Sequence, residues 1–177
     1  MGDGPRVPVG RPTEGACVVR LVHYSTEPLV TIRATIQQTR PVDKPRGLWV
    51  SDEATDWGWS HWNQAEEFID TDAQHATEIV LADDARLVVI STVAELDAFS
   101  AFRGTHRAGE ALFEIRWADV AAEAQGIVIS PYWWERRTER ESAWYYGWDC
   151  ASGCIWDPDA IAGLRPYEAP LVAEVAS

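Results

Sequence analysis

Residues 77–91, TEIVLADDARLVVIS, carry the clearest structural pattern in the chain. Two apolar runs, 77–81 and 86–91, are rich in β-branched residues and are separated by the polar turn ADDA. Runs of this length and composition, bounded by polar residues, are typical of β-strands. The sequence therefore predicts two strands here, joined by a turn.

Several shorter apolar segments meet the same criterion, and glycine or proline marks some of their boundaries. Residues 157–164 are expected to close the fold as a turn or a short helix, and the polar run 135–142 is expected to be an exposed connection. The further predicted strands are 17–23, 46–51 and 127–133, with 143–148 and 153–156 as two final strands or one bent strand; 29–38 is either a strand or a short helix.

Helical patterns are fewer than strand patterns. Asp52 and Asp56 offer N-cap chemistry for a helix that would extend to about Ile69. Thr92 is expected to begin a second helix, with Glu95 placed three residues later to complete a capping box.

A third helix is predicted over residues 117–124. Because strands outnumber helices and the two types are mixed along the chain, the predicted class is α+β with a mainly antiparallel sheet. Residues 1–16 contain three prolines and four glycines and are expected to form a flexible leader. Residues 17–177 are then expected to form a single domain.

The composition excludes several classes of protein. The chain has 177 residues, of which 46% are hydrophobic, which is enough for a packed core. No apolar run reaches the roughly 18 residues of a membrane helix, so no membrane association is expected. The cysteines, Cys17, Cys150 and Cys154, are few and odd in number, which favours a reduced, cytoplasmic protein. The histidines show no ligand-like spacing, so no metal site is predicted.

The charge is strongly negative and unevenly spread. The formal net charge is −13, and residues 52–97 carry twelve acidic residues against one cation, Arg86. This distribution argues against general binding to a nucleic acid backbone, although a local basic patch is possible at 136–140. Lys44 is the only lysine. One alternative function is therefore a non-enzymatic protein whose acidic 52–97 face binds a basic protein partner.

Tryptophan is unusually frequent, with ten in the chain. Four lie within 49–62 and five within 133–156, which suggests one shared aromatic region in space. Most of these rings are expected to fill the core. A second alternative function is a tryptophan-lined module that binds a sugar, a base or another small flat ligand.

Three motifs stand in a suggestive order along the chain: LVHYST at 21–26, RGLWVSDEATDWGW at 46–59 and SGCIWDPDAI at 152–161. Together they resemble the ADP-ribosyltransferase superfamily, in its diphtheria-toxin and poly(ADP-ribose) polymerase branch. The resemblance implies a split, mainly antiparallel sheet with short flanking helices. It also implies an enzyme that uses NAD as its substrate, cleaves the nicotinamide–ribose bond and transfers ADP-ribose to a protein or nucleic acid target.

The resemblance assigns roles to individual residues. It places His23 on the adenosine ribose of NAD. It implies that the backbone of Tyr24 and the hydroxyl of Ser51 or Ser25 bind the nicotinamide carboxamide. It implies that an aromatic residue, Trp49 or alternatively Trp57 or Trp59, stacks on nicotinamide. Gly47, at the start of the second motif, is counted with the cofactor-binding residues.

The catalytic acid is where the chain departs from the family pattern. The position that usually holds glutamate falls near Ser152, and no carboxylate stands there. Asp149 is the predicted acid because it borders the aromatic cluster; Glu135, Glu141 and Asp157 are the alternatives, and an inactive relative is also possible. A chain this short is expected to be a stand-alone effector or toxin-like enzyme, or a phage or bacterial factor.

Overall fold

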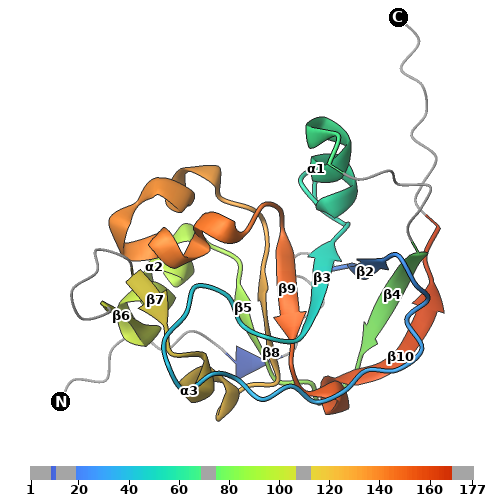
Figure 1. Cartoon of the computed structure of the whole chain (residues 1–177), viewed down its shortest axis with the longest axis horizontal. Coiled ribbons are helices and arrows are strands. Elements are labelled where there is room, and N and C mark those ends of the chain that lie inside the picture. Colours follow the sequence, from blue (N-terminus) through green and yellow to red (C-terminus); the bar gives the residue numbers. More distant parts are fainter. Residues whose placement is uncertain (1–8, 11–18, 69–74, 107–112, 169–177) are drawn as a thin grey trace, which may run out of the picture.

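The computed structural model describes residues 9–10, 19–68, 75–106 and 113–168. Eight strands form one curled sheet in the order β1-β5-β8-β9-β3-β2-β4-β10 (Figure 1). All neighbouring pairs are antiparallel except β5 and β8, which run parallel. A small second sheet pairs β6 with β7. The prediction of an α+β fold with a mainly antiparallel sheet is confirmed.

The strands are short and the helices few. The large sheet contains β1 (Val9–Gly10), β2 (Leu21–Ser25), β3 (Leu48–Asp52), β4 (His75–Leu81), β5 (Leu87–Ile90), β8 (Gly126–Ile129), β9 (Ser152–Ile155) and β10 (Ile161–Pro166); the small sheet contains β6 (Gly104–His106) and β7 (Phe113–Ile115). The α-helices are α1 (Trp59–Glu66), α2 (Val93–Arg103) and α3 (Trp117–Ala121), and the 3₁₀ helices are η2 (Trp134–Thr138), η3 (Arg140–Gly147) and η4 (Pro158–Ala160).

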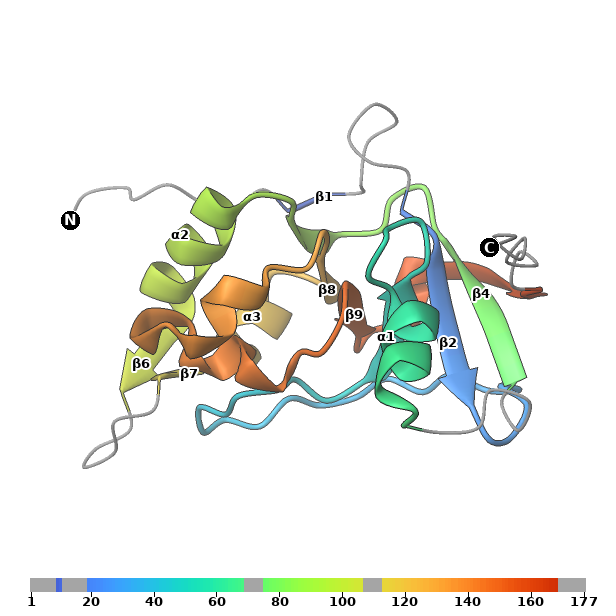
Figure 2. The same cartoon turned by 90° about the horizontal axis from the view of Figure 1, so that it is seen from above.

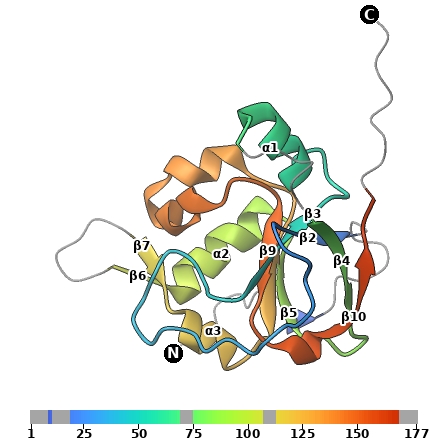
Figure 3. The same cartoon turned by 45° about the vertical axis from the view of Figure 1, so that its right-hand side comes forward.

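The strands 75–81 and 87–90 lie in different parts of the sheet. The polar turn between them carries the chain from β4, beside β2 and β10, to β5, beside β1 and β8. The sheet curls along its length, so the β4–β10 edge turns away from β5 and β8 (Figure 3). Among the described residues the strands form one hydrogen-bonded series from β1 to β10, but β2 and β3 pair at only two positions, and the split sheet that the resemblance implies stays a prediction.

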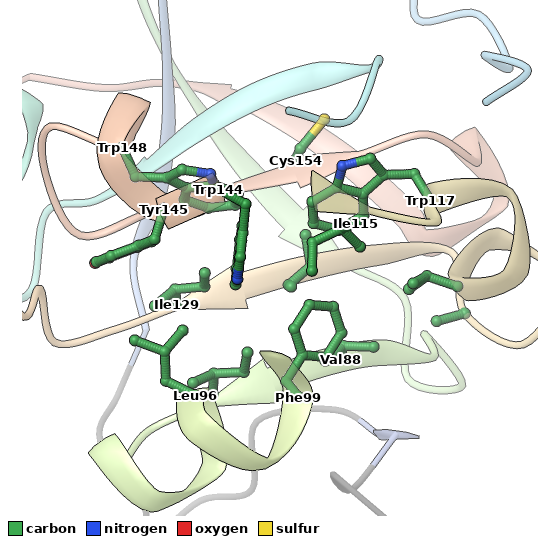
Figure 4. Packing of buried hydrophobic residues seen from close by; sticks show 14 of the residues in the cluster. Val88, Leu96, Phe99, Ile115, Trp117, Ile129, Trp144, Tyr145, Trp148 and Cys154 are labelled. Carbon is green, nitrogen blue, oxygen red and sulfur yellow. The ribbon is translucent and has the colours of Figure 1, made fainter. Parts of the chain in front are cut away.

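Both faces of the central strands are buried. Along β8, Ile127 and Ile129 belong to one core cluster and Val128 to the other, as the alternation of side chains along a strand requires. The larger cluster packs under α2, α3 and η3, where Phe99 and Trp144 meet (Figure 4). Full burial of an Ile, Leu or Phe side chain contributes about 1.5–3 kcal/mol, so these positions dominate the stability of the fold.

The helices lie in two groups (Figure 2). Helix α1 stands beside β2, while α2 and α3 lie on the other side of β8 and β9. Helix α2 begins with the predicted capping box: the Thr92 hydroxyl accepts from the Glu95 backbone, and the Glu95 carboxylate accepts from the Thr92 backbone. This reciprocal pairing satisfies two of the N–H groups that a helix start leaves unpaired.

Helix α1 differs from its prediction at both ends. It begins at Trp59 after Gly58, without a side-chain cap, and it ends at Glu66. Asp52 is fully buried at the end of β3 and its carboxylate accepts from the Arg20 and Ala54 backbones and from the Ser130 hydroxyl. The Asp52 carboxylate therefore connects the segments that contain Arg20, Ala54 and Ser130. The residues after Asp52 form a turn, and α1 starts only at Trp59.

Five other expectations differ from the structure. Residues 143–148 form 3₁₀ helix instead of strand, because Trp144, Tyr145 and Trp148 insert into the core and packing overrides their strand propensity. Residues 157–164, expected as a turn or a short helix, begin with the short helix η4 but then continue as edge strand β10. The run 135–142 contains η2 and the start of η3, and 29–38 forms neither strand nor helix. Within the expected leader 1–16, Val9–Gly10 form β1 against β5, and the rest of that leader lies outside the described residues.

Candidate functional site

A pocket opens where two neighbouring strands separate. β2 and β3 pair only at Leu21 with Asp52 and at Val22 with Ser51, and then part. The opening holds a pocket of about 300 Å³, at the lower end of the range for small-molecule sites. Its lining comes from β2 (Val22, His23, Tyr24), β3 (Trp49, Val50, Ser51), the segment leading into β9 (Gly147, Trp148, Asp149, Cys150, Ser152), and from Lys44 and Trp59.

Five of the residues that the sequence singled out meet in this pocket. They are His23, Tyr24, Trp49, Ser51 and Asp149, from three segments that are far apart in the chain. The antiparallel pairing of β3 with β9, with Ser51 opposite Ser152, brings the second and third motifs together. The β2–β3 pairing brings in the first motif.

Two of the predicted cofactor-binding residues lie outside the lining. The Ser25 hydroxyl donates to the Glu27 carbonyl in an exposed turn. Gly47 has a positive φ of 152°, and a Cβ there would lie 2.5 Å from the Ile155 carbonyl oxygen. Glycine is needed at this position for the close approach of two chain segments rather than for contact with a ligand.

His23 bridges the two separating strands. Its Nδ1 lies 2.7 Å from the carbonyl oxygen of Trp49. A carbonyl oxygen only accepts, so Nδ1 carries the proton in this bond. In the neutral ring Nε2 is then left as an acceptor, which suits a hydroxyl group of a ligand.

Ser51 is held by hydrogen bonds on both sides. Its hydroxyl donates to Oε1 of Glu53 at 2.6 Å and accepts from the Trp59 backbone N–H at 2.6 Å. Because the Ser51 hydroxyl proton is donated to Glu53, the Ser51 oxygen can only accept a hydrogen bond from a ligand. The carboxylate of Glu53 also accepts from the hydroxyl and backbone N–H of Ser60.

Glu53 is a carboxylate behind the pocket wall that the sequence interpretation missed. Glu53 lies in the turn after β3 ends at Asp52, so no strand periodicity marks it, and its contacts with Ser51 and Ser60 depend on how that turn folds. Burial raises the pKa of Tyr24 well above its usual range, and the Glu53 charge raises it further. The Tyr24 hydroxyl therefore stays protonated at neutral pH.

Asp149, the predicted acid, is ion-paired. Nη2 of Arg137 donates to its Oδ1 at 3.3 Å, and the side chain of Asp149 is 36% exposed. The guanidinium of Arg137 lies 4.7 Å from the ring centroid of Trp134 and 4.9 Å from that of Tyr146, and its Nε donates to the Tyr146 carbonyl. Asp149 therefore places a carboxylate at the pocket wall, and Arg137 compensates the charge of that carboxylate.

The other acids are placed differently. Glu135 and Glu141 are exposed and do not line the pocket. Asp157 caps η4 through Oδ1 and accepts from Gln125 through Oδ2, again outside the lining. Of the four acids considered from sequence, only Asp149 lines the pocket.

The pocket's cysteine is not activated. Burial raises the pKa of Cys150 to about 12, and burial raises that of Cys154 to about 12 as well, so both remain thiols at neutral pH. Cys17 lies outside the described residues.

Across the parts of the chain that the structure describes, no group of three or more His, Cys, Asp or Glu side chains is placed to hold a metal ion. None of the described helices combines the length and apolar character needed to cross a membrane.

The aromatic residues named for nicotinamide stacking differ in position. Trp49 and Trp59 line the pocket, and Trp49 meets Trp148 edge to face with ring centroids 4.9 Å apart. Trp57 is outside the lining and donates its indole N–H to the Asp149 carbonyl.

Comparison with family models, with curated proteins and with solved structures finds no match for this chain.

Proposed function

We propose that the protein binds NAD in the pocket between β2 and β3, cleaves the nicotinamide–ribose bond and transfers ADP-ribose to a macromolecular target. One observation carries the proposal: four residues to which the resemblance assigns roles, His23, Tyr24, Trp49 and Ser51, line a single pocket, and Asp149, the predicted acid, lines it with them. Short motifs that resemble a family by chance would have no reason to converge in space.

The reaction divides into two bond changes. The bond between nicotinamide nitrogen and ribose C1′ breaks, and its electron pair leaves with nicotinamide. A nucleophile of the target then bonds to C1′ and releases its proton. The ribose passes through an oxocarbenium-like cation, as in glycoside hydrolysis, so a fixed carboxylate near C1′ lowers the barrier.

The pocket residues supply the groups that this reaction needs. Trp49 or Trp59 offers a flat wall for the nicotinamide ring. Nε2 of neutral His23 accepts from a ribose hydroxyl, and Asp149 supplies the carboxylate. Ser51 can accept from the carboxamide NH₂ group, whereas its own proton is held by Glu53. A pocket of about 300 Å³ is too small for the whole dinucleotide, so part of NAD would extend beyond it.

The direct test is incubation with NAD labelled in the adenosine half and, separately, in nicotinamide. We expect release of nicotinamide together with transfer of the adenosine label to protein or to nucleic acid in a cell lysate. Nicotinamide release into water alone would indicate an NAD hydrolase. Absence of both, with NAD bound, would refute the enzymatic part.

The acid is tested by substitution. Asp149→Asn should lower turnover by about 10²-fold while NAD affinity stays within twofold, because the carboxylate acts on the cationic transition state. Glu135→Gln, Glu141→Gln and Asp157→Asn are the controls and should keep full activity. If Glu53→Gln is inactive and Asp149→Asn is active, the acid is Glu53; if every variant is fully active, the mechanism is wrong.

A binding module is the second candidate, and one observation favours it: the ion pair between Arg137 and Asp149 already compensates the charge of the proposed acid. Three indole rings, those of Trp49, Trp59 and Trp148, line the pocket and could hold a flat ligand without any reaction. Tight NAD binding without nicotinamide release would support this candidate.

A further inference from the structure

Lys44, the only lysine of the chain, lies in the pocket wall. It is half-buried, on the irregular segment between β2 and β3, and its Nζ lies 5.1 Å from the ring centroid of Trp49. Its stem packs against Gly147, where an added Cβ would lie 2.8 Å from its Cε. The Trp49 ring and the Gly147 backbone thus fix the ammonium at the pocket.

The ammonium of Lys44 has no carboxylate partner among the residues that the structure describes. Asp43, its neighbour, accepts from the Lys44 backbone N–H instead. Asp149 is paired with Arg137, and Glu53 accepts from Ser51 and Ser60. Of the two charged side chains that line the pocket, Asp149 is ion-paired and, among the described residues, Lys44 is not, although the whole chain carries −13.

A second donor in the same wall also lacks an acceptor. Trp148 is 1% exposed and lines the pocket, and its indole N–H has no hydrogen-bond partner within the described part of the chain. Buried donors are rarely left unpaired in native proteins. The other fully buried indoles in this core each donate: Trp117 to Val42, Trp144 to Ser100 and Trp156 to Ala124.

An ammonium without an ion-pair partner at an aromatic-walled pocket suits a ligand that carries an anionic acceptor next to a flat ring. A phosphate group is the strongest such acceptor, and lysine binds it as a point charge. On a protein with this negative net charge, an anion is repelled at long range, so a local unpaired cation has to hold it.

We propose that Lys44 binds a phosphate group of the pocket's ligand, so that the pocket selects nucleotides over the corresponding nucleosides. The inference rests on the proposed function in taking NAD as the natural nucleotide, whose diphosphate follows the nicotinamide ribose. It adds the group that anchors the ligand.

The uniqueness of Lys44 allows a test on the unmodified protein. An amine-acylating reagent can modify only Lys44 and the N-terminal amine, and peptide masses distinguish the two. The rate of acylation is measured with NAD, nicotinamide mononucleotide, ADP, inorganic diphosphate and nicotinamide riboside. We expect at least one phosphorylated compound to slow the acylation of Lys44 about tenfold at saturation, with the N-terminal amine unaffected and the riboside without effect. If no phosphorylated compound protects Lys44, or if the riboside protects it as well as the mononucleotide does, the proposal is wrong.

A pair of variants gives an independent measurement. Lys44→Met keeps the stem over Trp49 and removes the charge, whereas Arg46→Met removes an exposed cation outside the pocket lining. Affinity for the protecting phosphorylated compound should fall roughly tenfold or more in Lys44→Met and stay unchanged in Arg46→Met. Equal affinity in both variants would contradict the proposal.

Different results would refute the proposed function and the phosphate-binding role of Lys44. If wild-type protein cleaves NAD while Lys44 is neither protected nor needed, the proposed function stands and the phosphate role is refuted. If ADP or diphosphate protects Lys44 while NAD is neither bound nor cleaved, the phosphate role stands and the proposed function is refuted.

Discussion

We expect His23 to act both in the stability of the fold and in ligand binding, and a pair of substitutions can separate these two roles. Its Nδ1 ties β2 to the Trp49 carbonyl at 2.7 Å, and Nε2 is the acceptor available to the ligand. His23→Ala removes both groups. His23→Asn keeps a donor at the reach of Nδ1, because the asparagine amide nitrogen is bonded to Cγ as Nδ1 is, and it lacks a counterpart of Nε2.

The two variants should differ in stability and agree in binding. The lost hydrogen bond is part-buried, so water can reach the Trp49 carbonyl, and His23→Ala should lower the free energy of unfolding by about 0.5–1.5 kcal/mol. His23→Asn should stay close to wild type. Both should bind NAD about tenfold more weakly, which corresponds to about 1.4 kcal/mol for one lost ligand contact.

Urea unfolding followed by tryptophan fluorescence measures the stability, and calorimetry measures the affinity for NAD. Wild-type affinity in His23→Asn would show that Nε2 does not touch the ligand. Equal loss of stability in both variants would show that the Trp49 contact is not what His23 contributes to the fold.

Two further predictions concern the structure around the pocket. Gly47→Ala should lower the free energy of unfolding by about 2–4 kcal/mol, from the positive φ and the overlap with Ile155, as measured by urea unfolding. Gly163→Ala is the control, since nothing lies within 4 Å of a Cβ there, and an equal loss in both would contradict the argument. Cys150 and Cys154 should resist iodoacetamide at pH 8 until the protein is unfolded, as peptide masses would show. Because their folded pKa values of about 12 exceed the unfolded value, the unfolded state binds fewer protons between about pH 8.5 and 12, and stability should fall with rising pH by up to about 1.4 kcal/mol per unit for each thiol.

Local chemistry explains which elements the sequence could predict. The strands at 75–81 and 87–90 were predictable because their apolar, β-branched content is dense in a short run. The α2 capping box was predictable because both partners are three residues apart. By contrast, β10 is an edge strand whose side chains are mostly exposed, so only its pairing with β4 makes it a strand.

The site was only partly predictable for a related reason. His23, Trp49 and Ser51 lie on strands within motifs, so their spacing along the chain carries information. Lys44 lies on an irregular segment, and only the folded path of that segment brings it to Trp49. The pairing of Arg137 with Asp149 likewise depends on how η2 and η3 pack, which no local pattern encodes.

The negative net charge is easy to count in the sequence, but the structure shows that some of the acidic side chains are used inside the fold. The acidic block 52–97 predicts a face for a basic partner, yet several of its carboxylates serve internal contacts. Asp52 is fully buried and Glu53 binds Ser51 and Ser60. Burial alone would raise the pKa of Glu95, but the hydrogen bonds that it accepts from Ser91 and Thr92 bring it below its usual value. Carboxylates engaged in this way fasten strands and cap helices, so a negative total charge is compatible with a pocket lining in which Lys44 is the charged side chain without an ion-pair partner among the described residues.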